Sequence, residues 1–283
     1  MVPSMPRSVL IVFLCLAGSR LLFSDTAANA GGEHRCCVTS EQQKILDHFS
    51  LVFLDTGDGR RARTVRLSRA NLQVVNGMGA TNGNPEDPNS LQPGVAGTNG
   101  VGNLIVGYNE ARAGSMRTGS HNLVVGQGHA FERFGGVVNG RNNSIAAPFA
   151  SVIGGQTNAA SGSFSSVSGG QFNYATGESA SVSGGRYNWA TGHQSSVSGG
   201  RYNVASGDYA SVSGGEVNRA SGWSGSVSGG KGNEASGGLF TPSSVSGGRF
   251  NEASGEYSTV SGGFQRSSAG YDEWVAGGLS EPN

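Results

Sequence analysis

A five-residue segment, SVSGG, recurs through the second half of the chain at a nearly constant interval. It occupies residues 166–170, 181–185, 196–200, 211–215, 226–230 and 244–248, with near copies at 151–155 (SVIGG) and 259–263 (TVSGG). Counted on asparagine, the period is fifteen residues from Asn143 to Asn233, and Asn251 is displaced by a three-residue insertion within 237–244. A period this regular predicts one structural unit stacked many times.

Short strands are the only regular structure that fits this repeat. A helical hairpin needs about thirty residues or more per unit, and helices do not tolerate glycine at this density. The chain contains 49 glycines among 283 residues, where roughly 7% is usual, so a large conventional core is excluded. We therefore predict an all-β fold, a parallel β-roll or β-solenoid in which each turn uses one fifteen-residue repeat for two strands and two tight corners.

The consensus S-V-S-G-G-x-x-N-x-A-S/T-G predicts which side chains lie inside. The valines from Val167 to Val227 and the alanines from Ala175 to Ala235 do not vary between repeats, as a thin and closely packed interior requires. The asparagines are also expected inside, where identical amides about 4.8 Å apart would hydrogen-bond to one another in a ladder. The variable positions are expected to face outward or toward another chain.

Residues fifteen apart are expected to form vertical columns on the outside. The predicted columns are Phe172, Tyr187 and Tyr202, followed by Val217; Gln171, Arg186 and Arg201, followed by Glu216 and Lys231; and Tyr174, Trp189 and Val204. Arginine and aromatic residues dominate binding hot spots. We take Arg186, Tyr187, Trp189, Arg201 and Tyr202 as the candidate ligand-binding residues; the alternative is that the aromatics pack at a contact between subunits.

The first thirty residues predict a signal peptide. Arg7 precedes the apolar run SVLIVFLCLAG, and TAANA ends at Ala30 with the small-x-small pattern of a cleavage site. An uncleaved anchor is the alternative, because SRLLF (19–23) could lengthen the run. Export predicts a secreted or cell-surface protein with no transmembrane anchor after signal cleavage.

Signal cleavage would remove Cys15 and leave the adjacent Cys36 and Cys37. A disulfide between adjacent cysteines is strained and closes no useful loop, so the pair cannot stabilise the fold of one chain. The two cysteines could instead form interchain disulfides in the oxidising compartment that export supplies. Free thiols are an alternative, and His34 beside them suggests a metal ligand. No second Cys/His cluster completes four ligands, so we predict no metal and no cofactor.

The segment 39–54 predicts a short amphipathic helix. Thr39 or Ser40 can cap it, and Ile45, Leu46 and Phe49 follow at helical spacing. LVFL, the turn-rich DTGDGRR and ARTVRLSRANLQVV then predict two or three strands joined by a hairpin. We therefore expect a signal peptide at 1–30, the cysteine pair and helix at 31–55, an irregular strand and loop region with degenerate repeats at 56–135, and the β-roll at 136–283.

Charge and carboxylate placement argue against two classes of function. Nineteen basic residues balance nineteen acidic ones, so no net field recruits nucleic acid. The acidic residues of the repeats fall in different columns or distant turns and form no catalytic pair; they include Glu178, Asp208, Glu216 and Glu234. We expect neither an enzyme nor a nucleic-acid partner.

The recurring SVSGGxxNxASGxxS resembles the YadA-like head domains of trimeric autotransporter adhesins. The resemblance covers residues 136–278 and, more loosely, 103–129. It implies left-handed β-rolls packed as a homotrimer that binds extracellular matrix, host or glycan surfaces. The family's stalk and membrane barrel have no counterpart after WVAGGLSEPN, so we expect a secreted or otherwise tethered head. The alternative is a structural surface or sheath protein with no soluble ligand.

Overall fold

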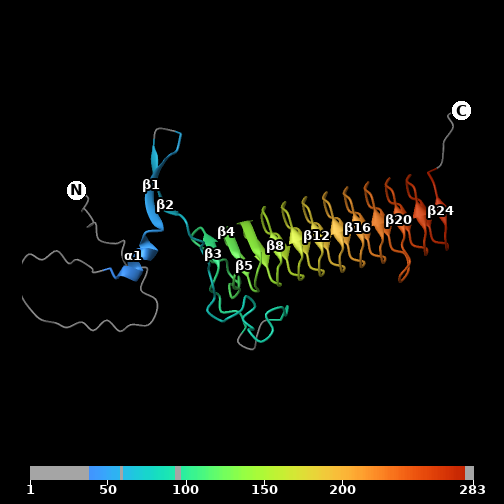
Figure 1. The fold of residues 1–283 in the computed structure, drawn as a ribbon. Helices are drawn as coiled ribbons and strands as arrows, with labels where there is room; N and C mark the ends of the chain where they lie inside the picture. The colour runs from blue at the N-terminus through green and yellow to red at the C-terminus, as the bar shows by residue number, and fades with distance from the viewer. Residues whose placement is uncertain (1–37, 58–59, 93–96, 278–283) are drawn as a thin grey trace, which may run out of the picture. The chain divides into compact units, whose positions relative to one another are not determined.

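The computed structural model describes residues 38–57, 60–92 and 97–277 (Figure 1). The expected signal peptide, His34 and the cysteine pair Cys36 and Cys37 lie outside the described residues. The chain divides into two compact units, one ending at Asn71 and one beginning at Leu72.

The first unit contains one helix and one β-hairpin. Helix α1 (Ser40–Leu46) starts with a capping box, in which Thr39 Oγ1 accepts from the Gln42 N–H at 3.2 Å and Gln42 Oε1 accepts from the Thr39 N–H at 2.9 Å. Strands β1 (Phe49–Asp55) and β2 (Arg61–Leu67) pair antiparallel over seven residues. The expected extension of the helical face to Phe49 was wrong, because Phe49 begins β1 and pairs with Leu67. The hairpin therefore crosses the boundary between residues 55 and 56 that was expected to separate the helical segment from the irregular region.

The second unit is a parallel β-solenoid, as predicted, and from β4 onward its turns add strands to two sheets. The larger sheet has twelve strands. They are β3 (Leu104–Val106), β4 (Leu123–Gln127), β6 (Val137–Arg141), β8 (Ser151–Val152), β10 (Ser166–Val167), β12 (Ser181–Val182), β14 (Ser196–Val197), β16 (Ser211–Val212), β18 (Ser226–Val227), β20 (Ser244–Val245), β22 (Thr259–Val260) and β24 (Trp274–Val275).

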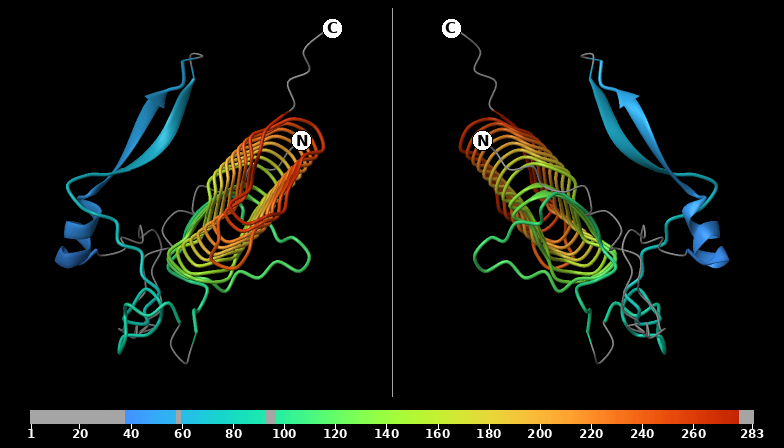
Figure 2. Two further views of the ribbon diagram at one scale, coloured as in Figure 1. Left: turned by 90° about the vertical axis from the view of Figure 1, so that its right-hand side faces the viewer. Right: turned by 90° about the vertical axis from the view of Figure 1, so that its left-hand side faces the viewer.

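The smaller sheet has ten strands. They are β5 (Ala130–Phe131), β7 (Ser144–Ile145), β9 (Ala159–Ala160), β11 (Tyr174–Ala175), β13 (Trp189–Ala190), β15 (Val204–Ala205), β17 (Arg219–Ala220), β19 (Glu234–Ala235), β21 (Glu252–Ala253) and β23 (Ser267–Ser268). Seen along the solenoid, successive turns superimpose as one flattened coil (Figure 2).

The thin interior is the one that the repeat predicts. Val182 pairs with Val197 and Ala190 with Ala205, and both columns are buried along the solenoid. Each turn therefore contributes small apolar side chains to a narrow core that runs the length of the unit. The largest buried apolar side chains of the described residues lie in its first turns, at Phe131, Phe134 and Ile145.

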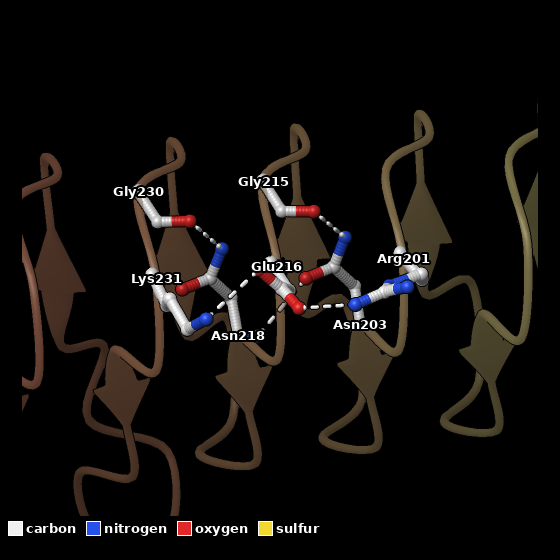
Figure 3. Close-up of polar contacts among 7 residues, drawn as sticks. All are labelled: Arg201, Asn203, Gly215, Glu216, Asn218, Gly230 and Lys231. Carbon is white, nitrogen blue, oxygen red and sulfur yellow. Dashed lines mark hydrogen bonds and ion pairs between the residues drawn. The ribbon is translucent and has the colours of Figure 1, made fainter.

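The asparagine column is buried as expected, but its hydrogen bonds differ from the predicted amide ladder. The side-chain oxygen of Asn203 accepts from the backbone N–H of Asn218 one turn later at 2.9 Å. Asn203 Nδ2 donates to the carbonyl oxygen of Gly199. It also donates to that of Gly215 in the next turn (Figure 3). The amides thus bond mostly to backbone groups at the bends, and the Gly215 carbonyl also accepts from the Arg201 N–H. A direct amide bond of the predicted kind joins Asn233 Nδ2 to Asn218 Oδ1 at 3.2 Å.

Two glycine columns allow the turns to approach one another. A Cβ atom at Gly192 would collide with the carbonyl oxygen of Gly207 in the next turn. At Gly185 the backbone is left-handed, with φ of 84°, and a Cβ atom would collide with the carbonyl oxygen of Gly200. Neither position can take a side chain without separating the turns.

Turn length changes along the solenoid. Leu104 pairs with Leu123, so the first turn contains nineteen residues. Val137 pairs with both Leu123 and Ser151, so the next two contain fourteen. From Ser151 onward the register is fifteen, until Ser226 pairs with Ser244 across the three-residue insertion. Because the solenoid strands begin at Leu104, its turns extend ahead of residue 136, into the region where the sequence predicted degenerate repeats.

Candidate functional site

The candidate residues lie at one corner of the solenoid, where the chain passes from the larger sheet to the smaller. From Arg141 to Arg249 a polar residue of each turn forms a single bridge to the next turn, and the following residue occupies the bend. Arg186 bridges to Arg201, and Tyr187 and Tyr202 are the bend residues with φ of 57° and 58°. Left-handed backbone costs a residue with a Cβ roughly 1–2 kcal/mol. The asparagine that follows anchors the bend from inside.

The bend residues of three consecutive turns form a continuous ring stack. Ring centroids are 4.8 Å apart between Phe172 and Tyr187 and 4.9 Å apart between Tyr187 and Tyr202, with interplanar angles of 10° and 4°. The predicted aromatic column is therefore confirmed. Parallel strand spacing dictates this separation, and the stacking offsets part of the cost of the left-handed bends.

Arginine side chains lie against this stack. The guanidinium carbon of Arg186 is 5.0 Å from the ring centroid of Tyr187, and that of Arg201 is 5.2 Å from that of Tyr202. Both distances are within the range of cation–π attraction. The rings also restrict where each guanidinium can lie, so the arginines are held beside the rings rather than extended into solvent.

One carboxylate orders the arginine column further along. Glu216 accepts from Arg201 at 2.6 Å and from Lys231 at 3.0 Å, one turn before and one turn after (Figure 3). Hydrogen bonds from Arg201 and Lys231 hold the pKa of Glu216 below its ordinary value, and the hydrogen bond to Glu216 raises the pKa of Arg201. Exposed ion pairs contribute little to stability. Their effect is to position the charges.

Trp189 belongs to the next column, at the start of strand β13. Its ring stacks on Tyr174 with centroids 5.8 Å apart and an interplanar angle of 18°. The buried Asn188 separates it from Tyr187 in the chain, and both rings are partly exposed on the outside. The structure therefore brings all five candidate residues onto two adjacent turns: Arg186, Tyr187 and Trp189 on one, Arg201 and Tyr202 on the next.

A second aromatic ridge, which was not predicted from the sequence, lies at the other corner, before the strands of the larger sheet. Phe149 and Phe164 stack with centroids 5.4 Å apart, and Tyr209 meets Trp223 edge to face at 5.9 Å. Phe164 is 48% exposed and Tyr209 is 47% exposed. For Phe164 and Tyr209 the signal in the sequence is an aromatic residue two positions after the glycine of the S/T-G pair, as in SGSF and SGDY, whereas Trp223 follows its glycine directly. It is interrupted by Ser179 and Gln194, so no unbroken column is visible.

Metal-binding and membrane-spanning features are absent from the described residues. Within 38–57, 60–92 and 97–277, no group of three or more His, Cys, Asp or Glu side chains could hold a metal ion. No helix in the same ranges is long and apolar enough to cross a membrane.

The corner is a surface of ordered rings, guanidinium groups and one bridging carboxylate. No family model matches the chain, and no curated protein is significantly similar to it in sequence. The function of the protein must therefore be inferred from its residues and their geometry.

Proposed function

We propose that the protein is an exported, trimeric, adhesin-like head that binds extracellular matrix, host or glycan surfaces through the variable columns of its β-solenoid. The observation that carries this proposal is the Arg186/Tyr187 and Arg201/Tyr202 corner. The interior repeats the same residues turn after turn, whereas this corner carries stacked rings and arginines that the interior does not require.

The geometry of the corner suits recognition. Rings that are already stacked and guanidinium groups that are already positioned lose little conformational freedom when a ligand binds. Tyrosine and arginine provide apolar area, hydroxyl groups and fixed donors at the same place. Because the turns repeat, such a binding surface can be enlarged by adding turns to the solenoid.

Self-association is supported by the first unit. None of its described residues is buried, and Leu51, Phe53 and Val65 are each more than half exposed. A two-stranded hairpin is marginally stable at best on its own. Leu51 and Val65 are cross-strand partners, so their side chains form an apolar face that copies of this segment would cover in a homotrimer.

The test is an alanine variant of the corner, with Arg186, Tyr187, Arg201 and Tyr202 all replaced. We expect at least tenfold weaker binding to an array of matrix proteins and glycans, with no change in molecular mass by light scattering. The matched control replaces Ser168 and Ser183, exposed serines that directly follow strands β10 and β12, with alanine and should bind as the wild type does. Equal binding by corner variant and control would refute the proposal.

The same experiment separates the structural alternative. An intact oligomer that binds nothing on the array, while the protein is found in a surface layer, would favour a sheath function. A monomer in solution would remove the trimer from the proposal.

A further inference from the structure

The ring stack at the candidate corner is interrupted after Tyr202. The bend position holds Val217 in the next turn and Gly232 in the turn after, before Phe250 resumes the aromatic column. A hollow of about 370 Å³ opens on the surface there, within the size range of small-molecule sites. We name it the Gly232 notch, and it is lined by Tyr202, Val217, Gly232 and Phe250, with Arg219 and Glu234 beside them.

The walls of the notch are aromatic and open to solvent. Tyr202 is 40% exposed, and the next bend position holds only the smaller Val217. A Cβ atom at Gly232 would meet Cδ1 and Cε1 of Phe250, so the phenyl ring lies beside bare backbone. The notch is a place where one ring of the column is missing and where an external ring would find aromatic neighbours.

The rim of the notch carries both cationic hydrogen-bond donors and carboxylate acceptors, and these are paired with one another. Arg219 Nε lies 3.5 Å from Glu234 Oε1, and both side chains are about half exposed. Across the bend, Lys231 pairs with Glu216 at 3.0 Å. An ionic ligand would have to break one of these pairs, whereas a hydroxyl group can accept from a cation and donate to a carboxylate at once.

These two properties define one ligand class. A pyranose ring has an apolar face of C–H groups that packs on aromatic rings, and hydroxyl groups around its edge. We propose that the Gly232 notch binds one pyranose ring of a neutral oligosaccharide. The inference rests on the proposed function, since it places glycan binding at one site on the same corner.

The test fills the notch with the side chain that the column lacks. Gly232→Tyr adds a ring at a bend with φ of 65°, where other turns carry tyrosine, and only the Phe250 side chain must move aside. The matched control is Thr157→Tyr, which adds the same ring at the same bend position ahead of Phe172. Isothermal titration would use cellotriose, triacetylchitotriose and lactose as probes, with the full array in parallel.

We expect Gly232→Tyr to bind at least one wild-type probe sugar more than tenfold more weakly, and Thr157→Tyr to bind within twofold of wild type. If Gly232→Tyr proves unstable by circular dichroism, Arg219→Gln with Glu234→Gln keeps the backbone and should weaken binding by about tenfold, because the charge-assisted hydrogen bonds to the sugar hydroxyls are replaced by weaker neutral ones. Unchanged sugar affinity in these variants would overturn the proposal that the notch binds a pyranose ring.

The outcomes distinguish the notch from the proposed function. In one outcome the wild type binds matrix proteins but no probe sugar, and the alanine corner variant loses the matrix binding. This result overturns the proposal that the notch binds sugar and leaves the proposed function in place. A wild-type protein that binds neither sugars nor matrix proteins overturns both.

Discussion

The backbone N–H of Asn203 donates a 3.0 Å hydrogen bond to the side-chain oxygen of Asn188, one turn earlier. The same relationship links consecutive asparagines along the solenoid, for example Asn173 to Asn158 and Asn218 to Asn203. Each buried amide thereby joins neighbouring turns, since its nitrogen also reaches a carbonyl of its own turn and one of the next. The polar column holds the turns in register where the narrow apolar core cannot.

Replacing one of these asparagines should destabilise the solenoid strongly. Asn188→Ala leaves the Asn203 N–H and the Gly184 carbonyl without their partner, and the Gly200 carbonyl keeps only its bond from the Arg186 N–H. Buried groups that lose their hydrogen bonds cost about 1–3 kcal/mol each. We expect the free energy of unfolding in urea to fall by about 3 kcal/mol or more. The exposed Gln171→Ala should change it by less than about 0.5 kcal/mol.

The position of His129 predicts a pH dependence of stability. His129 Nδ1 accepts from the Asn143 N–H at 3.2 Å and Nε2 donates to the Val125 carbonyl at 2.9 Å, as the asparagines of later turns do. Burial, aided by the charge of Arg112, lowers the pKa of His129 below its ordinary value. The unfolded chain therefore binds the proton first, and stability is lost as pH falls below about 6.5.

Thermal unfolding between pH 7.5 and pH 5 tests this dependence. His129→Asn should remove much of it and keep the hydrogen bonds, because an asparagine at this position reaches the same carbonyl four residues back. His193→Asn, at a corner of the solenoid, serves as the control. A His129→Asn protein whose profile is unchanged would contradict the assignment.

The close approach of the turns predicts different effects on stability when two glycines, Gly184 and Gly192, are replaced. A Cβ atom at Gly192 would collide with the backbone of Gly207, whereas one at Gly184 would have nothing within 4 Å. Gly192→Ala should lower the free energy of unfolding by about 3 kcal/mol, and Gly184→Ala should be nearly neutral. Equal effects in chemical denaturation would show that the turns are not packed as described.

One bend carries a residue poorly suited to it. Val217 is β-branched and has φ of 59°, and Asn142 occupies the same bend in an earlier turn with φ of 55°. Asparagine tolerates left-handed backbone better than valine. We expect Val217→Asn to raise the free energy of unfolding by about 0.5–1 kcal/mol. The control Val204→Asn, within strand β15, should lower it instead.

The fifteen-residue period was enough to predict the solenoid, the valine and alanine interior and the Phe172–Tyr187–Tyr202 stack. Identical residues one period apart must lie one above another once the strands are parallel, so columns follow from counting. The amide pattern could not be predicted in this way, because it depends on which carbonyl groups the bends turn inward. The role of His129 was hidden for the same reason, since it takes an asparagine position in a turn of different length.

Other features depended on local competition that periodicity does not resolve. Phe49 suits the apolar face of a helix, but pairing across a seven-residue hairpin draws it into β1. The Gly232 notch arises because Phe250 follows Gly232 in the same column of bend residues. The hollow depends on where the surrounding side chains lie, so the sequence alone does not predict it. The second aromatic ridge was missed because polar residues interrupt it.

The three-residue insertion at 237–244 leaves the pairing of Val227 with Val245 undisturbed. Extra chain is absorbed at a solvent-exposed corner, where Leu239 and Phe240 are 80% and 66% exposed, and the strands on either side keep their register. This corner is therefore a natural point for grafting foreign peptides. A peptide displayed there would project from a rigid rod at a fixed distance from its stacked neighbours, and in several copies if the same graft were made at successive turns.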